Sequence, residues 1–310
     1  MADAGAILVV SMNPSIDVTM GVDCLRAGGT NRARFVREDA GGKGVNVARA
    51  LRAQGAEEVW ATGLMWREGG KILMDALERD GVACDFCLLE GATRRNIKIL
   101  DEEKAEITEI NAGSPPVTAG DLRLAREKLL SRAKRAKMVV LTGSLPTACP
   151  PDFYARAIAS CGAPCALDAD GEALAAGVAA KPFLLKCNEK ELGVIAQGET
   201  VLERVKTVLD RGVSIVLASM GAQGSVMANA RGAWRAAPLS LNVRSTVGAG
   251  DAMLSGFLAA YAREADPVWA FRAAVASASA SVEGEGTFMP SSAGAARYLP
   301  HIQIERVMEW

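Results

Sequence analysis

Residues 245–253, Ser-Thr-Val-Gly-Ala-Gly-Asp-Ala-Met, lead from a strand-like stretch into a long helical pattern. Apolar side chains then recur at four-residue spacing and form one face of that helix: Met253, Phe257 and Tyr261. Gly248, Ala249 and Gly250 therefore lie at the helix N-terminus, where free N–H groups and the helix dipole favour an anion. A glycine turn before an ordinary helix gives the same pattern, so this segment alone leaves both interpretations open.

Asp251 falls in the first turn of the same helix, where its negative charge is favourable. A carboxylate beside an anion-binding turn can accept the proton of an attacking hydroxyl. The N–H groups meanwhile neutralise charge on a transferring phosphoryl group. The segment is therefore typical of a kinase, with Asp251 as the candidate base and Gly248, Ala249 and Gly250 as the anion hole.

Outward from this segment, short apolar runs alternate with helical patterns. The predicted strands are Ala6–Ser11, Met138–Thr142, Cys165–Asp168, Phe183–Lys186 and Ser214–Ser219. The predicted helices are Val45–Gln54, Gly70–Asp80, Asp121–Ala136, Asp152–Ser160 and Val201–Arg211. Continuous apolar strands suit a parallel sheet covered by helices on both faces, so the predicted class is α/β. Ligands of such sheets bind beyond the carboxyl ends of the strands.

A second pattern consists of short strands with polar alternation and no crossover helices. Its members are Asp17–Val22, Arg32–Glu38, Asn96–Leu100 and Glu106–Ile110. We predict that they form a small antiparallel β lid, from about residues 17–38 and 94–111, over one end of the main sheet.

A second glycine-rich turn opens the helix predicted near residue 45. Gly41 and Gly42 allow close backbone approach to a ligand, and Asn46 in the first helical turn faces the same side. The spacing around Lys43 is not that of a Walker A loop, so Lys43 is not assigned to ATP on that ground. A glycine turn without a ligand is the more frequent finding for this pattern alone.

Four further segments carry candidate polar contacts. Asp17 follows an Asn-Pro turn and could bind sugar hydroxyls, although an ordinary turn has the same sequence. Arg94 belongs to an arginine pair that could bind phosphate or lie solvated at the surface. Asn188 and Glu191 have the spacing of a helix capping box, and could instead reach Mg²⁺ through water. Residues 219–224 contain two glycines and suit a turn against a nucleotide.

Composition narrows the classes of function. The chain has 310 residues with 35 basic and 36 acidic side chains, which gives no general attraction to nucleic acid or membranes. It shows no signal peptide or membrane span, so a cytoplasmic protein is expected. His301 is the single histidine, which argues against Ser-His or Cys-His catalysis. The seven cysteines include two closely spaced pairs that could bind a metal, but buried reduced thiols are more typical.

Taken together, the segments resemble the ribokinase-like (PfkB) carbohydrate kinases, in particular the branch of 1-phosphofructokinases and tagatose-6-phosphate kinases. The resemblance covers nearly the whole chain, in order: NPSID, AGGKGVNVARAL, TRRNIKI, TEIN, LTGSLP, KCNEKEL, SMGAQGS and STVGAGD. It implies a single kinase domain over residues 1–310, with a mostly parallel sheet, flanking helices and a β lid that serves homodimerisation. It also implies ATP and Mg²⁺ as cofactors and a sugar phosphate as substrate.

The resemblance assigns a role to each candidate residue. Asp251 is the base, with Gly248, Ala249 and Gly250 as the anion hole. Sugar hydroxyls lie near Asp17, Gly41, Gly42 and Asn46. The phosphate already on the sugar is held by Lys43, Arg94, Arg32 and Ser144. The nucleotide is bordered by Lys186, Asn188, Glu191, Ser219, Gly221 and Gly224, and Asn188 and Glu191 reach Mg²⁺ indirectly through water.

The sequence departs from the family pattern at two places. Cys187 stands where the family usually has proline, which restores a backbone N–H. Residues 143–148 read GSLPTA where the family usually has GSLPPG, so the loop near the sugar phosphate is altered. The second departure affects substrate preference rather than reaction type.

Three functions fit this pattern. The first is phosphorylation of a ketohexose phosphate: fructose 1-phosphate by resemblance, with tagatose 6-phosphate and fructose 6-phosphate as alternatives. The second is a kinase for an unphosphorylated sugar or a nucleoside, against which the cations Lys43 and Arg94 argue. The third is a non-catalytic sugar-phosphate sensor, which would not need to keep the base and the anion hole.

Overall fold

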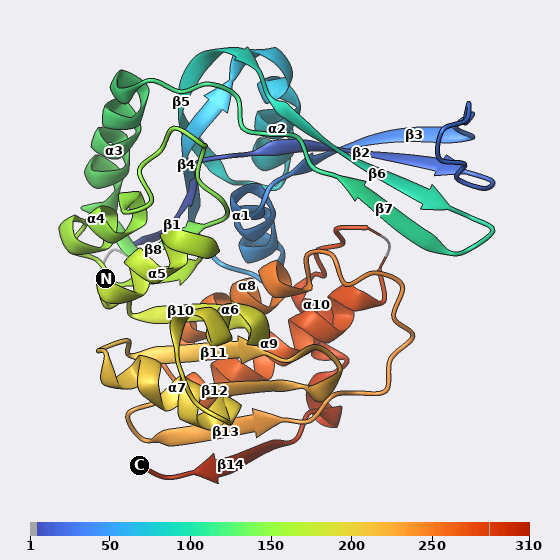
Figure 1. The fold of residues 1–310 in the computed structure, drawn as a ribbon. Helices are drawn as coiled ribbons and strands as arrows, with labels where there is room; N and C mark the ends of the chain where they lie inside the picture. Colours follow the sequence, from blue (N-terminus) through green and yellow to red (C-terminus); the bar gives the residue numbers. More distant parts are fainter. Residues whose placement is uncertain (1–4, 285) are drawn as a thin grey trace.

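The computed structural model describes residues 5–284 and 286–310. Within them the strands form two sheets (Figure 1). The larger has ten strands in the order β14-β13-β12-β11-β10-β9-β8-β1-β4-β5, and the smaller has four in the order β3-β2-β6-β7. The predicted α/β class, with a mostly parallel main sheet and a small lid, is confirmed.

Seven neighbouring strands of the main sheet are parallel: β5 (Ala83–Ala92), β4 (Val59–Trp66), β1 (Ala6–Ser11), β8 (Ala136–Thr142), β9 (Cys165–Asp168), β10 (Leu184–Asn188) and β11 (Ile215–Ser219). The antiparallel strands β12 (Ser225–Asn229), β13 (Gly232–Ala236) and β14 (Ile304–Met308) complete one edge. Every residue of β1 and β9 is buried, as the apolar sequence of a strand covered on both faces requires.

Helices cover both faces of the main sheet. One face packs against α1 (Lys43–Ala53), α2 (Arg67–Arg79), α8 (Ala249–Glu264), α9 (Pro267–Val282) and α10 (Ser292–Ala296). The other packs against α3 (Ala119–Ala133), α4 (Phe153–Ser160), α5 (Gly171–Ala179), α6 (Glu189–Ile195) and α7 (Val201–Asp210). Two 3₁₀ turns, η1 (Gly221–Gln223) and η2 (Leu299–His301), lie in loops. In the part of the chain described, no helix is long and apolar enough to span a membrane.

The lid extends away from the main sheet on one side (Figure 1). It contains β2 (Ser15–Val22), β3 (Phe35–Gly41), β6 (Arg94–Asp101) and β7 (Glu106–Ile110). The prediction of a wholly antiparallel lid is wrong, because β2 and β6 pair in parallel. The reason is topological: β2 continues from β1 and β6 continues from β5, and these two parallel strands leave the main sheet in the same direction.

Candidate active site

The N-terminus of α8 forms one wall of the candidate site. Gly248 adopts a left-handed conformation, with φ of 81°, immediately before the first helical residue. A Cβ atom at this position would lie 2.9 Å from both Thr287 and Met289, so the turn requires glycine. The first N–H groups of α8 have no intrahelical partners, and they point out of the helix as an anion-binding turn requires.

Asp251 lies in the first turn of α8 and is only 5% exposed. Its Oδ2 accepts a hydrogen bond of 3.0 Å from Nδ2 of Asn46 on α1. Burial raises the pKa of Asp251 to about 6, and the negative charge of Asp168 adds to the rise. The hydrogen bond from Asn46 and the charges of Lys43 and Lys186 oppose that pKa rise. At neutral pH the carboxylate is therefore ionised, with a pKa near enough to 7 to accept a proton.

Asp168, the last residue of β9, is fully buried between two lysines. Its Oδ1 lies 3.0 Å from Nζ of Lys43 and 3.4 Å from Nζ of Lys186. Burial alone would raise the pKa of Asp168, but Lys186 and Lys43 outweigh it and hold this pKa below its usual range. Asp168 was predicted as the last residue of a strand but not as a site residue. An acid at the carboxyl end of a buried parallel strand was the available signal.

The two lysines place positive charge beside the turn that opens α8. A Cβ atom at Gly250 would lie 2.6 Å from Nζ of Lys186, so glycine at this position allows the ammonium group to approach the helix. Burial disfavours the charge of Lys43, but Asp168 and then Asp251 outweigh burial and raise its pKa. Two ammonium groups and a helix N-terminus therefore converge where a transferring phosphoryl group would carry its negative charge.

The base of the lid contributes a second polar cluster, centred on the buried Asp17. A Cβ atom at Gly41 would lie 2.5 Å from Oδ1 of Asp17, which explains the glycine. The same Oδ1 accepts a hydrogen bond of 3.2 Å from Asn96, and Oδ2 accepts one of 2.8 Å from Nζ of Lys98. Lys98 also donates to Oγ1 of Thr287 at 3.3 Å, which joins the lid to the loop after α9. Asn96 and Lys98 were not predicted as site residues.

Arg94 begins β6 beside this cluster. Its Nη2 donates to the carbonyl oxygen of Asn13 at 2.9 Å, and its Nη1 donates to Oδ1 of Asn96 at 3.1 Å. Nδ2 of Asn13 in turn donates to Oγ of Ser144 at 3.1 Å and to Oγ of Ser114 at 2.8 Å. Oδ1 of Asn13 is buried and has no hydrogen-bond partner among residues 5–284 and 286–310. A buried acceptor of this kind is expected where a polar ligand completes the site.

The predicted nucleotide side lies along β10 and β11. The capping-box interpretation of Asn188 and Glu191 is confirmed, because each side chain bonds to the other residue's backbone N–H, at 2.9 and 2.8 Å. Ser219 pairs in register with Asn188 across the two strands. Gly221 begins η1, and Gly224 has φ of 92° and approaches the backbone of β13. These two segments, 188–191 and 219–224, follow β10 and β11 at the carboxyl edge of the main sheet.

Two predicted residues are placed differently from the rest. Arg32 is exposed in the loop between β2 and β3, at the end of the lid far from the main sheet (Figure 1). It therefore does not meet Arg94 within this chain. Lys43 does not share a contact with Arg94 either, since it pairs with Asp168 at the α8 side of the site.

Comparison with known proteins gives a consistent result. The family model of the pfkB family carbohydrate kinases matches residues 9–293. A 1-phosphofructokinase of Rhodobacter capsulatus is 37% identical over 263 residues, which cover 81% of this chain and 82% of the relative. A 1-phosphofructokinase of Bacillus subtilis is 30% identical over 309 residues, which cover 97% and 100%.

Among solved structures, phosphofructokinase-2 from Escherichia coli in complex with potassium superposes with a TM-score of 0.89. The two sequences are 25% identical, and the match covers 96% of this chain and 99% of the other. The fold, the polar groups at the sheet edge and the relatives all point to one class of enzyme. The chain belongs to the pfkB family of carbohydrate kinases and is an ATP-dependent sugar kinase.

Proposed function

We propose that the protein transfers the γ-phosphoryl group of ATP to the C6 hydroxyl of fructose 1-phosphate, giving fructose 1,6-bisphosphate. The observation that carries this proposal is the buried Asp251 carboxylate at the N-terminus of α8, held by Asn46 and faced by two lysines. The curated relatives that match over most of the chain are 1-phosphofructokinases, which favours fructose 1-phosphate over tagatose 6-phosphate and fructose 6-phosphate.

The residues divide between the two ends of the sugar. At the reacting end, Asp251 accepts the proton of the C6 hydroxyl while the backbone N–H groups of residues 248–250 hold the transferring phosphoryl group. Lys43, which the sequence analysis placed at the resident phosphate, is held by Asp168 and is assigned to this end instead. The ring hydroxyls bind Asp17, Asn46 and the backbone of Gly41 and Gly42.

The far end of the sugar binds the phosphate that it already carries. Arg94 supplies the charge there, because its guanidinium bonds to the carbonyl oxygen of Asn13, whose side chain bonds to Ser144. The unpartnered Oδ1 of Asn13 suits a ligand hydroxyl, which can donate a hydrogen bond to it. An unphosphorylated sugar or a nucleoside would leave the Arg94 charge without a counterion, which makes it a poorer candidate substrate.

ATP and Mg²⁺ are assigned to the carboxyl ends of β10 and β11. Lys186 and the α8 N-terminus suit nucleotide phosphates, and Ser219, Gly221 and Gly224 suit the rest of the nucleotide. The capping box uses one carboxylate oxygen of Glu191, so its Oε1 can orient a water ligand. No group of three acidic, cysteine or histidine side chains in the described residues could hold a metal directly, which fits a water-mediated site. When bound, Mg²⁺ supplies positive charge at the phosphates.

The two sheets are proposed to act as one kinase domain that forms a homodimer through the lid in the cytoplasm. Several apolar side chains are exposed on the lid: Phe35, Val36, Ile107 and Ile110. Arg32 lies too far along the lid to serve the site of its own chain. A lid-mediated dimer would bring Arg32 towards the partner subunit's substrate.

Steady-state kinetics on fructose 1-phosphate, tagatose 6-phosphate and fructose 6-phosphate test the proposed substrate. The expected order of kcat/KM places fructose 1-phosphate first, since a site built to bind a hydroxyl discriminates strongly when that contact is lost. A higher kcat/KM for either alternative would change the assigned substrate and leave the assignment as a sugar-phosphate kinase intact. Failure of ADP release with all three, and with unphosphorylated sugars, would support the sensor function instead.

A further inference from the structure

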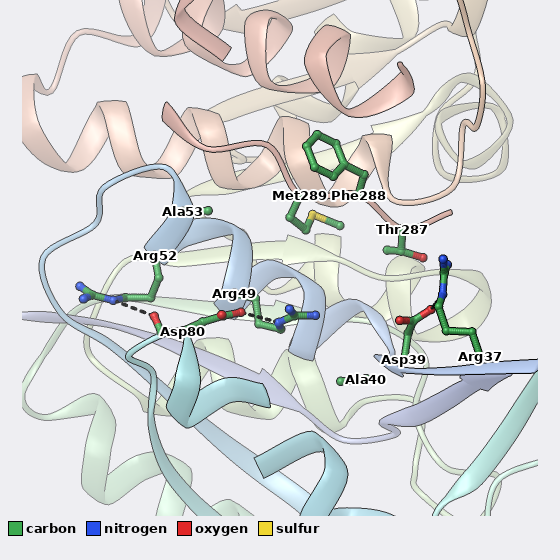
Figure 2. A pocket seen from close by; sticks show the side chains of 10 residues that line it. All are labelled: Arg37, Asp39, Ala40, Arg49, Arg52, Ala53, Asp80, Thr287, Phe288 and Met289. Carbon is green, nitrogen blue, oxygen red and sulfur yellow. Dashed lines mark hydrogen bonds and ion pairs between the residues drawn. The ribbon is translucent and has the colours of Figure 1, made fainter. Parts of the chain in front are cut away.

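A cavity of about 550 Å³ lies on the outer flank of α1, between this helix, β3, the end of α2 and the loop after α9 (Figure 2). Its volume falls in the range of sites for small metabolites. None of the residues assigned above to the sugar, the nucleotide or the anion hole lines it. The lining residues are Arg37, Asp39, Ala40, Arg49, Arg52, Ala53, Asp80, Thr287, Phe288 and Met289.

Two arginines in this cavity are held in place but keep most of their donors. Nε of Arg37 bonds to Asp39 at 2.7 Å, and Nε of Arg49 bonds to Asp80 at 2.6 Å. Each carboxylate thus fixes the guanidinium by its inner nitrogen. The terminal Nη nitrogens of both arginines have no hydrogen-bond partner within residues 5–284 and 286–310. The two Nη nitrogens of a guanidinium match the spacing of two phosphate oxygens, so arginine binds a phosphate group in a bidentate manner.

Arg52 does not add to this pair, because it serves the end of α1. Its Nη1 donates to the carbonyl oxygens of Ala56 and Glu57, both at 2.6 Å. Figure 2 shows its guanidinium at the opposite end of the cavity from Arg37. Near Arg37 and Arg49 the two aspartates balance the two guanidinium charges, so anion binding at this end rests on the terminal Nη donors rather than on net charge.

The rest of the lining is apolar. Ala40 and Ala53 are small, and Met289 comes from the loop after α9 above α1 (Figure 2). An inorganic ion would fill only the part of the cavity near the arginines. A phosphate ester would in addition place its carbon skeleton against Ala53 and Met289, where contact with apolar groups removes surface from water.

The same loop connects the cavity to the candidate active site. Thr287 lines the cavity and accepts a hydrogen bond from Lys98, the lysine paired with Asp17. Thr287 and Met289 also lie against Gly248, the glycine of the anion-binding turn. A ligand that presses on these two side chains therefore acts on both halves of the active site.

We propose that this cavity is an effector site for a small organic phosphate, whose phosphate group is bound by Arg37 and Arg49. Occupation of the site changes turnover through Thr287 and Met289. Binding at the cavity does not depend on which sugar phosphate is the substrate, so the proposal stands apart from the choice of fructose 1-phosphate.

Calorimetric titration tests the site with AMP as the organic phosphate and pyrophosphate as the free anion. The enzyme is first saturated with ADP and Mg²⁺, so that the catalytic nucleotide site is filled. AMP is expected to bind one site per chain more tightly than pyrophosphate does. Arg37→Met combined with Arg49→Met should weaken AMP binding by at least about tenfold, because the charge-assisted bonds are lost.

Arg67→Met is the matched control, since Arg67 pairs with Glu90 on the exposed surface away from the cavity. This variant should bind AMP as the unmodified enzyme does. Initial rates at saturating substrates should change with AMP in the control and stay constant in the double variant, whose basal rate is kept. AMP binding that survives in the double variant, or pyrophosphate binding as tightly as AMP, would overturn the proposal.

Discussion

Asp251 and Asp168 occupy one site, yet their pKa values shift in opposite directions. Asp251 has one neutral hydrogen-bond donor and lies near another carboxylate, so burial prevails and its pKa rises to about 6. Asp168 is equally buried but has a lysine on each side, and its pKa falls. Opposite shifts in neighbouring carboxylates are typical of an acid–base site, where one group moves a proton and the other stays charged.

Asp251→Asn is expected to lower kcat by about 10²–10⁴-fold, the usual cost of removing a general base. Binding of ATP and sugar phosphate should persist, because asparagine keeps the shape of the side chain. Steady-state and equilibrium titrations separate the two effects. Turnover of the variant near that of the unmodified enzyme would exclude Asp251 as the base.

The same substitution should stabilise the fold at alkaline pH. Because the folded-state pKa of Asp251 is raised from 3.8 to about 6, its contribution to stability is present below pH 4 and lost as pH rises through 6. A neutral asparagine side chain carries no such cost, so Asp251→Asn should unfold at higher temperature than the unmodified protein at pH 8. The difference should disappear near pH 4, and thermal unfolding at both pH values measures it.

The acid limb of the pH profile of kcat/KM, which reports the free enzyme, should lie near pH 6, where Asp251 becomes protonated. Asp168→Asn should move this limb to lower pH. The substitution removes a charge that raises the pKa of Asp251 and leaves Lys43 and Lys186, which lower it, without their counterion. A limb that stays in place in Asp168→Asn would show that the two carboxylates are not coupled.

Arg94 and Lys43 are expected to act at different ends of the sugar. Arg94→Met should reduce kcat/KM for the sugar phosphate by roughly 10- to 150-fold, the equivalent of about 1.5–3 kcal/mol for a charged contact. Its effect on the corresponding unphosphorylated sugar should be much smaller. Lys43→Met should lower kcat on both sugars alike. If Arg94→Met reduced kcat/KM equally on both sugars, Arg94 would not bind the phosphate that the sugar already carries.

Sequence motifs found the site residues beside glycine turns and some on strands, such as Asp17 and Lys186, but missed Asp168 and Lys98. Asp251 and Asn46 follow glycines at helix starts, so their pattern is local, and the structure shows them in contact. Asp168 and Lys98 stand on strands and are brought to the site by pairing with distant segments. Asp168 had one local signal, an acid at the carboxyl end of a buried strand, whereas nothing local distinguishes Lys98 from a solvated strand residue.

At the scale of elements, the predicted strands and helices are present, but regular elements such as α5, α9, β13 and β14 were not predicted. The bounds of β1, β7 and β9 agree with the prediction. The strands β4 and β5 were missed, because β4 contains Gly63 with φ of 126° and β5 mixes charged with apolar residues. Gly63 is nevertheless required, since a Cβ atom there would lie 2.0 Å from the carbonyl oxygen of Ser11 on β1.

The base of the lid contains a buried ion pair between two of its own strands. Lys98 of β6 and Asp17 of β2 are each about 10% exposed, and Lys98 also bonds to Thr287 outside the lid. Lys98→Met should raise KM for the sugar phosphate more than it lowers kcat, because Asp17 loses the group that positions it. It should also destabilise the protein by up to ~3–5 kcal/mol, since a buried charge is left unpaired.

Lys98→Arg is the control for this positioning role, because it keeps the charge. The KM of Lys98→Arg should lie closer to that of the unmodified enzyme than the KM of Lys98→Met does. If Lys98 served packing alone, the apolar methionine would disturb KM less than arginine. Unchanged KM values in Lys98→Met would show that the pair is only structural.

At the scale of the molecule, the exposed face of the lid predicts the oligomeric state. Val36 and Ile110 are 58% and 54% exposed, and strand register places them on the same face, opposite to Asp17. Val36→Asp with Ile110→Asp should convert a dimer to a monomer, as light scattering would report. Val194→Asp is the control, because Val194 is 74% exposed on α6, away from the lid. A monomeric unmodified protein, or a double variant of unchanged mass, would contradict the lid dimer.

The position of β1 between β4 and β8 has a consequence for synthesis on the ribosome. One hydrogen-bonding edge of β1 can be covered once residue 66 has emerged, but the other stays open until residue 142 follows. At ~5–20 residues per second, this apolar strand has an unpaired edge for about ten seconds. During that interval we expect the open edge of β1 to be available to chaperones that bind extended apolar segments. Asp251 emerges later still, so the growing chain cannot turn over sugar during that interval.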